Sequence, residues 1–142
     1  MQAVVFVGIQ GSGKSTYYRR HFADTHVRLN RDMLRTQNRE QVLMHACLAV
    51  GQPFVIDNTN PLRQTRARYV ALAKAAGFRT LAVVFDAPLE LALARNAERE
   101  GRARVPDVAI HGTLAKLEPV SVTEGFDEIQ RVDAVREAEV SA

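Results

Sequence analysis

The chain has 142 residues, of which 46% are hydrophobic, 25% charged and 6% aromatic. A chain of this length forms one domain with its own core, and the composition excludes disordered, collagen-like and disulfide-rich proteins. Cys47 is the single cysteine, so no disulfide can form within the chain, as is usual in a reducing compartment. The formal net charge is +3, with 16 Arg against 3 Lys. Arginine is the better bidentate partner for phosphate.

The sequence contains no membrane or secretion signal that we can recognise. No apolar run approaches the roughly 20 residues that a membrane-spanning helix needs. The first residues, MQAVVFV, lack the basic segment and the cleavage site of a secretory signal. We therefore expect a soluble, cytoplasmic protein that makes no membrane contacts.

Short continuous apolar runs predict the strands, at residues 3–7, 27–29, 53–57 and 80–85. Runs of this kind are typical of a parallel sheet that is covered by helices on both faces. Because the runs alternate with helical segments, we expect an α/β three-layer sandwich with a mainly parallel sheet of four to five strands.

The helices are predicted from apolar spacing and from capping residues. Asn38 with Gln41 resembles a capping box, and Asn60 followed by Pro61 is typical of an N-cap and a first helical position. The expected helices cover about 14–22, 32–50 with a break near Gln37, and 61–76, and two more begin at Pro88 and Pro106.

The clearest motif is GIQGSGKS, residues 8–15, which matches G-x-x-x-x-G-K-[ST] between a predicted strand and a predicted helix. Its glycines allow a turn whose N–H groups converge on an anion, at the positive end of the helix. Lys14 can reach the β- and γ-phosphates of a nucleoside triphosphate, and the Ser15 hydroxyl can bind Mg²⁺. The motif predicts binding of ATP with Mg²⁺ through Gly8, Gln10, Gly11, Ser12, Gly13, Lys14, Ser15 and Thr16.

The segment LNRDMLR, residues 29–35, follows the second predicted strand. Ligands collect at the carboxyl ends of parallel strands, so Asp32 is expected opposite the γ-phosphate, where it can accept the proton of an attacking hydroxyl. An N-cap role for Asp32 is an equally good interpretation. Arg35 is expected on the same side of the helix, where it can hold a phosphate of the acceptor. Arg28 and Arg31 are interpreted as solvated or flanking charges.

Asp57 follows the third predicted strand, in VIDNTN. An acidic residue at this place can hold Mg²⁺ through water, together with Ser15. The alternative is a structural turn and helix cap made by residues 58–60. The candidate substrate-binding residues at this edge are Arg31, Arg35, Asp57 and Asn58.

Residues 93–105 form a polar segment with four arginines, which we interpret as a short, mobile, Arg-rich lid. Arg95 and Arg99 are four residues apart, and an arginine that closes over the triphosphate stabilises charge in the transition state. The alternative is a solvated loop in which the arginines pair with Glu98 and Glu100. The four histidines show no metal-ligand spacing, so neither a zinc site nor a nucleophilic triad is predicted.

In order and spacing, GIQGSGKST, LNRDMLR, VIDNTNPLRQTRARYVALAKAAG, the Arg-rich lid and the late EGF resemble the 5′-hydroxyl polynucleotide kinase family. The similarity is greatest to the kinase domain of the eukaryotic bifunctional polynucleotide phosphatase/kinase and covers about residues 4–130. It implies a P-loop kinase-type domain over residues 1–132, followed by a C-terminal tail over 133–142 that frays or forms a loose helix.

The resemblance also implies an activity, the transfer of the γ-phosphate of ATP to the 5′-hydroxyl end of DNA or RNA. It makes Asp32 the general base and Lys14 and Ser15 the ligands of the ATP phosphates and Mg²⁺. It places Arg99 on the donor phosphates with Arg95 as its partner, and Arg35 on the neighbouring phosphate of the substrate.

Two other functions stay open from the sequence. The chain lacks a phosphatase motif, so it is expected to act alone or with a separate phosphatase or ligase. One alternative is a P-loop kinase of a small-molecule or modified tRNA hydroxyl. The other is a non-catalytic module that binds ATP and nucleic acid.

Overall fold

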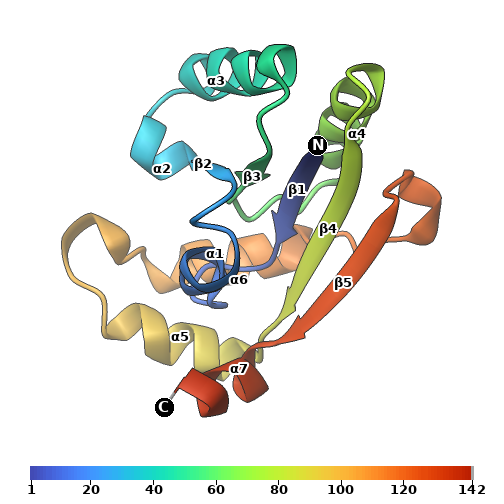
Figure 1. Ribbon diagram of the computed structural model, residues 1–142. Helices are drawn as coiled ribbons and strands as arrows, with labels where there is room; N and C mark the ends of the chain where they lie inside the picture. Colours follow the sequence, from blue (N-terminus) through green and yellow to red (C-terminus); the bar gives the residue numbers. More distant parts are fainter. Residues whose placement is uncertain (142) are drawn as a thin grey trace.

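A computed structural model describes residues 1–141, with side chains described for residues 1–137. The described residues form one sheet of five parallel strands in the order β2-β3-β1-β4-β5 (Figure 1). The predicted α/β fold with a parallel sheet is therefore confirmed. The strands are β1 (Gln2–Val7), β2 (Val27–Leu29), β3 (Phe54–Ile56), β4 (Arg79–Asp86) and β5 (Glu128–Asp133).

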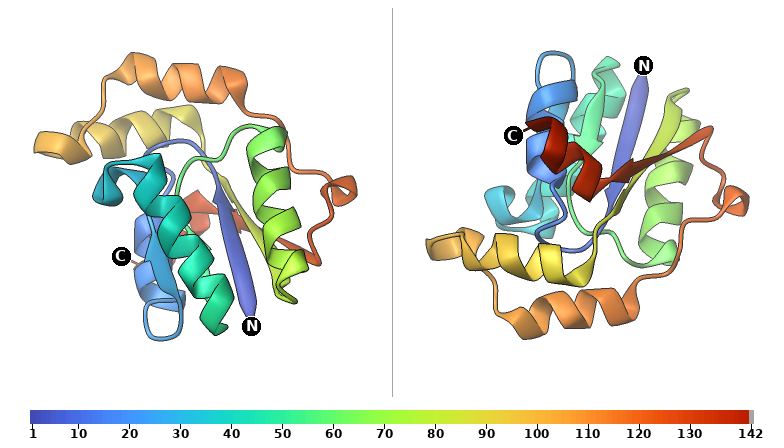
Figure 2. Two further views of the ribbon diagram at one scale, coloured as in Figure 1. Left: turned by 90° about the horizontal axis from the view of Figure 1, so that it is seen from above. Right: turned by 90° about the horizontal axis from the view of Figure 1, so that it is seen from below.

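Helices cover both faces of the sheet and its carboxyl end. Helices α3 and α4 lie on one face and α1 on the other, while α5 and α6 lie across the end at which the strands finish (Figures 1 and 2). The helices are α1 (Lys14–His21), α2 (Arg31–Leu34), α3 (Gln37–Val50), α4 (Arg63–Ala75), α5 (Leu89–Ala97), α6 (Asp107–Lys116) and α7 (Ala134–Ser141), with 3₁₀ turns η1 (Gly101–Ala103) and η2 (Val122–Glu124).

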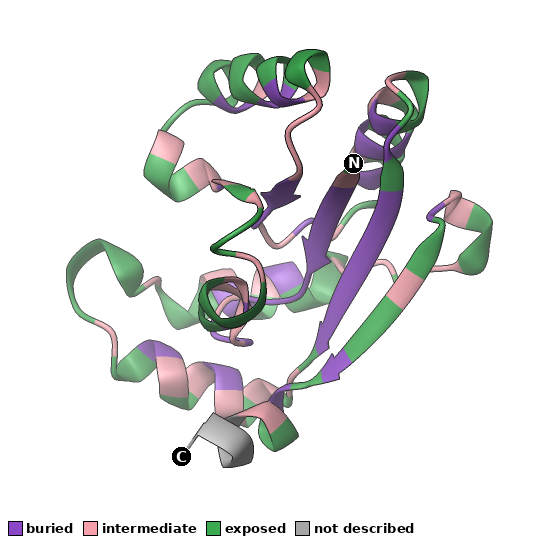
Figure 3. Ribbon diagram, in the orientation of Figure 1, coloured by how far each residue is buried: buried purple, intermediate pink, exposed green. Residues whose placement is uncertain are grey.

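The central strand β1 divides the core into two parts because its side chains alternate between the faces. Val5 packs with Met44 of α3 and Tyr69 of α4, whereas Phe6 packs with Tyr17 of α1 on the opposite face. Both sides of β1 and β4 are buried, and β5 is largely exposed at the edge of the sheet (Figure 3). Because β1 is buried on both faces, its sequence is a continuous apolar run, whereas the exposed strand β5 has no such run.

The predicted cap of the helix after β3 is wrong. Helix α4 begins at Arg63, and Asn60 lies before it in the left-handed region with φ 46°. The Asn60 side chain points inward and donates a 2.8 Å hydrogen bond to the Phe6 carbonyl oxygen. A buried amide of this kind satisfies backbone carbonyls of the strand ends, which leaves it unable to cap the helix.

The predicted capping box at residues 38 and 41 is also wrong. Thr36 is the N-cap of α3, because its hydroxyl accepts a 3.1 Å hydrogen bond from the Arg39 N–H. The break between α2 and α3 falls at Arg35, which ends α2 with φ 76°. A left-handed arginine is strained, at about 1–3 kcal/mol.

The end of the described chain is helical, as α7 runs from Ala134 to Ser141. Its first residue, Ala134, is 1% exposed and lies directly after β5. The boundary at residue 132 stays a prediction, and residue 142 lies outside the described residues. Within residues 1–141, every helix is too short or too polar to cross a membrane.

Candidate functional site

The loop between β1 and α1 has the geometry of an anion cradle. Gly11 and Gly13 adopt φ of 79° and 94°, conformations that L side chains rarely adopt. A Cβ on Gly11 would also lie 2.5 Å from the Ala92 carbonyl oxygen of α5, so only glycine fits. The loop leads directly into the N-terminus of α1 at Lys14, where helix N–H groups favour an anion.

The Lys14 side chain folds back over this loop. Its Nζ donates to the carbonyl oxygens of Gly8 (2.9 Å) and Ile9 (2.7 Å) and to Ser12 Oγ (3.4 Å). Burial lowers the pKa of Lys14 from 10.5 to about 8, and the negative charges of Asp57 and Asp32 oppose this shift. The amine is therefore held in the cradle by neutral acceptors, and charged phosphate oxygens are stronger partners for it.

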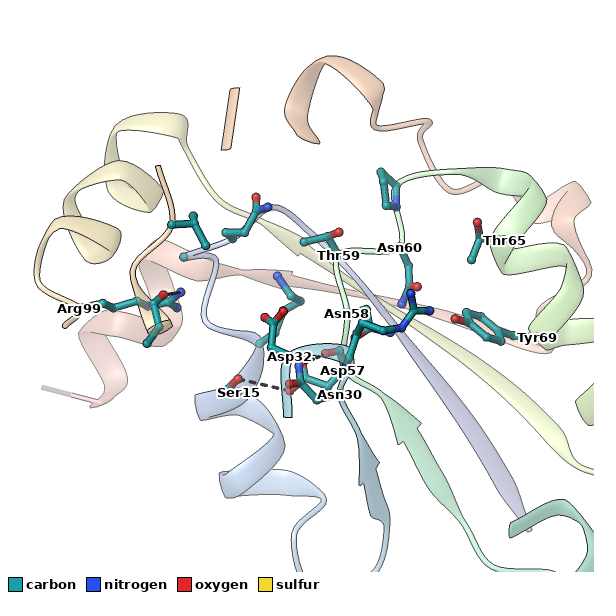
Figure 4. A pocket seen from close by; sticks show the side chains of 17 residues that line it. Ser15, Asn30, Asp32, Asp57, Asn58, Thr59, Asn60, Thr65, Tyr69 and Arg99 are labelled. Atoms are coloured by element: carbon teal, nitrogen blue, oxygen red, sulfur yellow. Dashed lines mark hydrogen bonds between the residues drawn. The ribbon is translucent and has the colours of Figure 1, made fainter. Parts of the chain in front are cut away.

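Ser15, Asp57 and Arg28 form a compact cluster at the start of α1. Ser15 Oγ donates to Asp57 Oδ2 at 3.3 Å, the contact drawn in Figure 4. Arg28 Nε donates to the same oxygen at 2.7 Å, and its Nη2 donates to Ser15 Oγ at 2.9 Å. The sequence interpretation of Arg28 as a solvated or flanking charge is therefore wrong. Its partners, Asp57 and Ser15, lie on other elements, so the sequence around Arg28 does not indicate them.

Asp32 lies in the first turn of α2, and its exposed side chain faces the cavity. Asn30 is the N-cap of this helix, since its Oδ1 accepts a 2.9 Å hydrogen bond from the Met33 N–H. The N-cap interpretation of Asp32 is thereby excluded. Asn30 is held in turn by a 2.6 Å hydrogen bond from its Nδ2 to the Asp57 carbonyl oxygen. In the described part of the chain, the Asp32 carboxylate accepts no hydrogen bond and is open to a ligand.

A buried carboxylate stabilises the side of the first cavity on which Asp32 lies. Glu40 of α3 is 2% exposed and accepts hydrogen bonds from Arg31 Nη2 (3.2 Å), Asn58 Nδ2 (2.8 Å) and the Tyr69 hydroxyl (3.0 Å). Asn58 Oδ1 accepts a further 2.8 Å bond from the Arg31 N–H. Arg31 and Asn58 are therefore part of an ordered network beside Asp32. Sequence reasoning missed Glu40, because its partners come from α2, the segment after β3, and α4.

Apart from Gly8 and Arg35, the candidate site residues line two cavities of about 400 and 390 Å³. Figure 4 shows the first of them. Arg99 lines both of them. Arg35 is exposed and lines neither cavity, so the structure does not bring it to the other candidates. The first cavity is lined by Gln10, Gly11, Lys14, Ser15, Arg31, Asp32, Asp57, Asn58 and Arg99, and the second by Ser12, Gly13, Thr16, Arg95 and Arg99.

The Arg-rich segment is more ordered than the predicted loop. Helix α5 extends through Arg95 to Ala97, and the η1 turn follows. Arg95 Nη1 donates to the Gly11 carbonyl oxygen at 3.4 Å, so this arginine rests against the cradle. Arg95 and Arg99 therefore approach the cradle from α5 and the segment after it, and neither pairs with Glu98 or Glu100 among the ion pairs of the described residues.

A family model described as an AAA domain matches residues 4–120. The chain belongs to the AAA domain family. The bifunctional polynucleotide phosphatase/kinase of Schizosaccharomyces pombe is 27% identical over 135 residues, which are 92% of this chain and 33% of that protein. This match agrees with the resemblance seen in the sequence motifs. The chain spans about a third of the length of the curated relatives it matches.

Solved structures show the same fold at lower identity. An unliganded sugar kinase from Janibacter sp. HTCC2649 aligns with a TM-score of 0.67 at 22% identity, covering 95% of this chain and 86% of that chain. Chaetomium thermophilum Kti12 in complex with ADP-AlF3 aligns with a TM-score of 0.65 at 17% identity, covering 98% and 96%. The P-loop kinase-type fold is thus confirmed.

The oxygen donors at the cradle fit the metal that the motif implies. Ser15 and Asp57 supply a hydroxyl and a carboxylate to the first cavity, and Mg²⁺ is usually bound by one or two such groups together with substrate phosphates. Among the described residues, no group of three or more His, Cys, Asp or Glu side chains gathers as for a metal site of protein ligands alone. The donor set therefore suits a cation that binds together with a nucleotide.

Proposed function

We propose that this chain is an ATP-dependent kinase that phosphorylates the 5′-hydroxyl end of a polynucleotide, DNA or RNA. The observation that carries the proposal is the exposed carboxylate of Asp32, which has no hydrogen-bond partner among the described residues and faces the same cavity as Lys14 and Arg99. An acceptor hydroxyl placed between them has a base on one side and a cationic phosphate site on the other. The relative of 27% identity, a polynucleotide phosphatase/kinase, supports a polynucleotide as the acceptor.

In the proposed mechanism, the backbone N–H groups of the cradle and Lys14 hold the β- and γ-phosphates. Asp32 accepts the proton of the 5′-hydroxyl while the hydroxyl oxygen forms a bond to the γ-phosphorus. The bond between the γ-phosphorus and the bridging oxygen breaks, and ADP leaves. Lys14 and Arg99 stabilise the negative charge that spreads over the transferred group.

Other residues have supporting roles in this proposal. Ser15 and Asp57 would hold Mg²⁺, which when bound neutralises charge on the β- and γ-phosphates. Thr16 and Arg95 line the second cavity and contact the remainder of the nucleotide. Arg31 and Asn58 contact the acceptor beside Asp32.

The direct test measures the transfer of label from γ-labelled ATP, in the presence of Mg²⁺, to 5′-hydroxyl DNA and RNA oligonucleotides. Matched 5′-phosphorylated oligonucleotides and a panel of sugars and nucleosides are tested in parallel. We expect label on the 5′-hydroxyl oligonucleotides alone. Label on a small molecule instead would indicate a metabolite kinase, and ATP binding without transfer to any acceptor would indicate a binding module.

A further inference from the structure

The Ser15–Asp57 pair is already neutralised by an internal cation. Asp57 has a side chain that is 1% exposed, and its Oδ2 accepts from both Arg28 Nε (2.7 Å) and Ser15 Oγ (3.3 Å). The Arg28 guanidinium lies 6.0 Å from the centre of the Tyr18 ring. It reaches the pair from β2, and it is not among the residues that line the first cavity.

Counting protons and lone pairs shows what Arg28 does to the Ser15 hydroxyl. A hydroxyl has one proton and two lone pairs. The Ser15 proton goes to Asp57, and one lone pair accepts from Arg28 Nη2 at 2.9 Å. One lone pair therefore remains for a ligand on the cavity side. Arg28 orients the hydroxyl for a metal ion, but it also cancels the negative charge that would attract one.

We propose that Arg28 makes divalent-metal binding at Ser15 and Asp57 conditional on bound nucleotide. Without a nucleotide, an approaching cation meets a carboxylate whose charge the guanidinium already balances, so binding is weak. The negative charges of a bound triphosphate restore the attraction, and the oriented Ser15 lone pair then completes the coordination. This inference rests on the proposed function only in that a nucleotide and a divalent cation bind at the cradle.

The test measures binding of Mn²⁺ by electron paramagnetic resonance, which follows the free ion, with and without a non-hydrolysable ATP analogue. Arg28→Gln removes the charge and keeps a hydrogen-bonding side chain, and Arg28→Lys keeps the charge. Arg131→Gln is the matched control, because Arg131 also lies on a strand and pairs with one carboxylate, that of Asp86. Should Arg28→Gln fail to fold, Arg28→Met retains an apolar stem beside Tyr18 and takes its place.

Without nucleotide, we expect Arg28→Gln to bind Mn²⁺ at least about tenfold more tightly than the wild type. Arg28→Lys and Arg131→Gln should bind like the wild type. Equal Mn²⁺ affinity of wild type and the neutral variants without nucleotide would overturn the inference. If only the proposed kinase function were wrong, oligonucleotides would stay unlabelled. The Mn²⁺ affinity of Arg28→Gln would still exceed that of the wild type.

Discussion

The side-chain amide of Asn96 forms two hydrogen bonds with the backbone of Val105. Its Nδ2 donates to the Val105 carbonyl oxygen at 2.6 Å, and its Oδ1 accepts from the Val105 N–H at 2.9 Å. Asn96 is 0% exposed, whereas Val105 is half-buried. They join the two ends of the segment that carries Arg99, which fixes where this segment leaves and rejoins the domain.

Asn96→Ala should loosen the Arg99 segment without removing an arginine. Losing two hydrogen bonds of a buried amide and leaving the Val105 backbone unpaired should lower the free energy of unfolding by about 2 kcal/mol. We also expect a raised KM for ATP. Denaturant unfolding and steady-state kinetics measure the two effects, with Asn38→Ala on the exposed surface of α3 as the control. An unchanged KM would show that this junction does not position Arg99.

Glu40→Gln should lower the stability of the chain, because it disrupts the hydrogen-bond network beside Asp32. The carboxylate accepts from three side chains, and the neutral amide would leave Arg31 without its charged partner. Since Arg31 is partly exposed, we expect a loss of about 2 kcal/mol in unfolding free energy rather than the larger penalty of a fully buried pair. Glu90→Gln, an exposed carboxylate on α5, should leave stability unchanged.

The same substitution has a spectroscopic signature. Burial, and then the neighbouring Glu40 carboxylate, raise the pKa of Tyr69 above its usual value of 10.0. In Glu40→Gln the burial remains and the charge is lost, so the pKa of Tyr69 should fall while staying above that usual value. Ultraviolet difference spectra recorded across an alkaline titration measure the ionisation of Tyr69. An unshifted titration would contradict the contact between the two side chains.

The sequence predicts the elements whose signals are local. The β1 run and the glycine positions before Lys14 could be read directly, because burial on both faces and positive φ restrict which residues fit. Strand β5 carries no such local signal, since an exposed edge strand shows no continuous apolar run. The roles of Arg28 and Asn60 cannot be predicted from the sequence for another reason. Their partners, Asp57 and the Phe6 carbonyl oxygen, are brought near by strand pairing that one segment does not encode.

Lys14 should make nucleotide affinity depend on pH. Burial lowers its pKa to about 8, and phosphates raise it again on binding. Above that pH, binding must take up a proton, so the affinity for ATP should fall by up to about tenfold per pH unit. Calorimetry at pH values on either side of 8 measures this. Lys14→Arg should show a flat profile, because its guanidinium stays charged.

Lys14 should also make the stability of the nucleotide-free chain depend on pH. Here stability should increase with pH, whereas the affinity for ATP should decrease. The pKa of Lys14 is about 8 in the folded chain, below its ordinary value of 10.5, so the unfolded chain holds more protons between these values. The contribution of Lys14 to stability should therefore rise as pH increases from about 8 to about 10.5. Unfolding measured across this range should lose that trend in Lys14→Met, and a persisting trend would point to other groups.

Arg99 and Arg102 provide a matched pair of arginines. Arg99 lines both cavities, whereas Arg102 is exposed in the η1 turn. Arg99→Ala should lower kcat by about 10²- to 10³-fold, because it removes a cation aimed at charge that develops in the transition state. Arg102→Ala should have no effect on kcat. Equal effects of the two substitutions would mean that only the net charge of the segment matters.

The most direct test of the account is the rate of phosphate transfer from labelled ATP to a 5′-hydroxyl oligonucleotide by Asp32→Asn, a near-isosteric change that removes the base. We expect kcat to fall by about 10²- to 10⁴-fold while the affinity for ATP stays within about twofold of the wild type. Asp24→Asn, at an exposed position, should transfer phosphate normally. Transfer by Asp32→Asn at the wild-type rate would contradict the role assigned to this carboxylate.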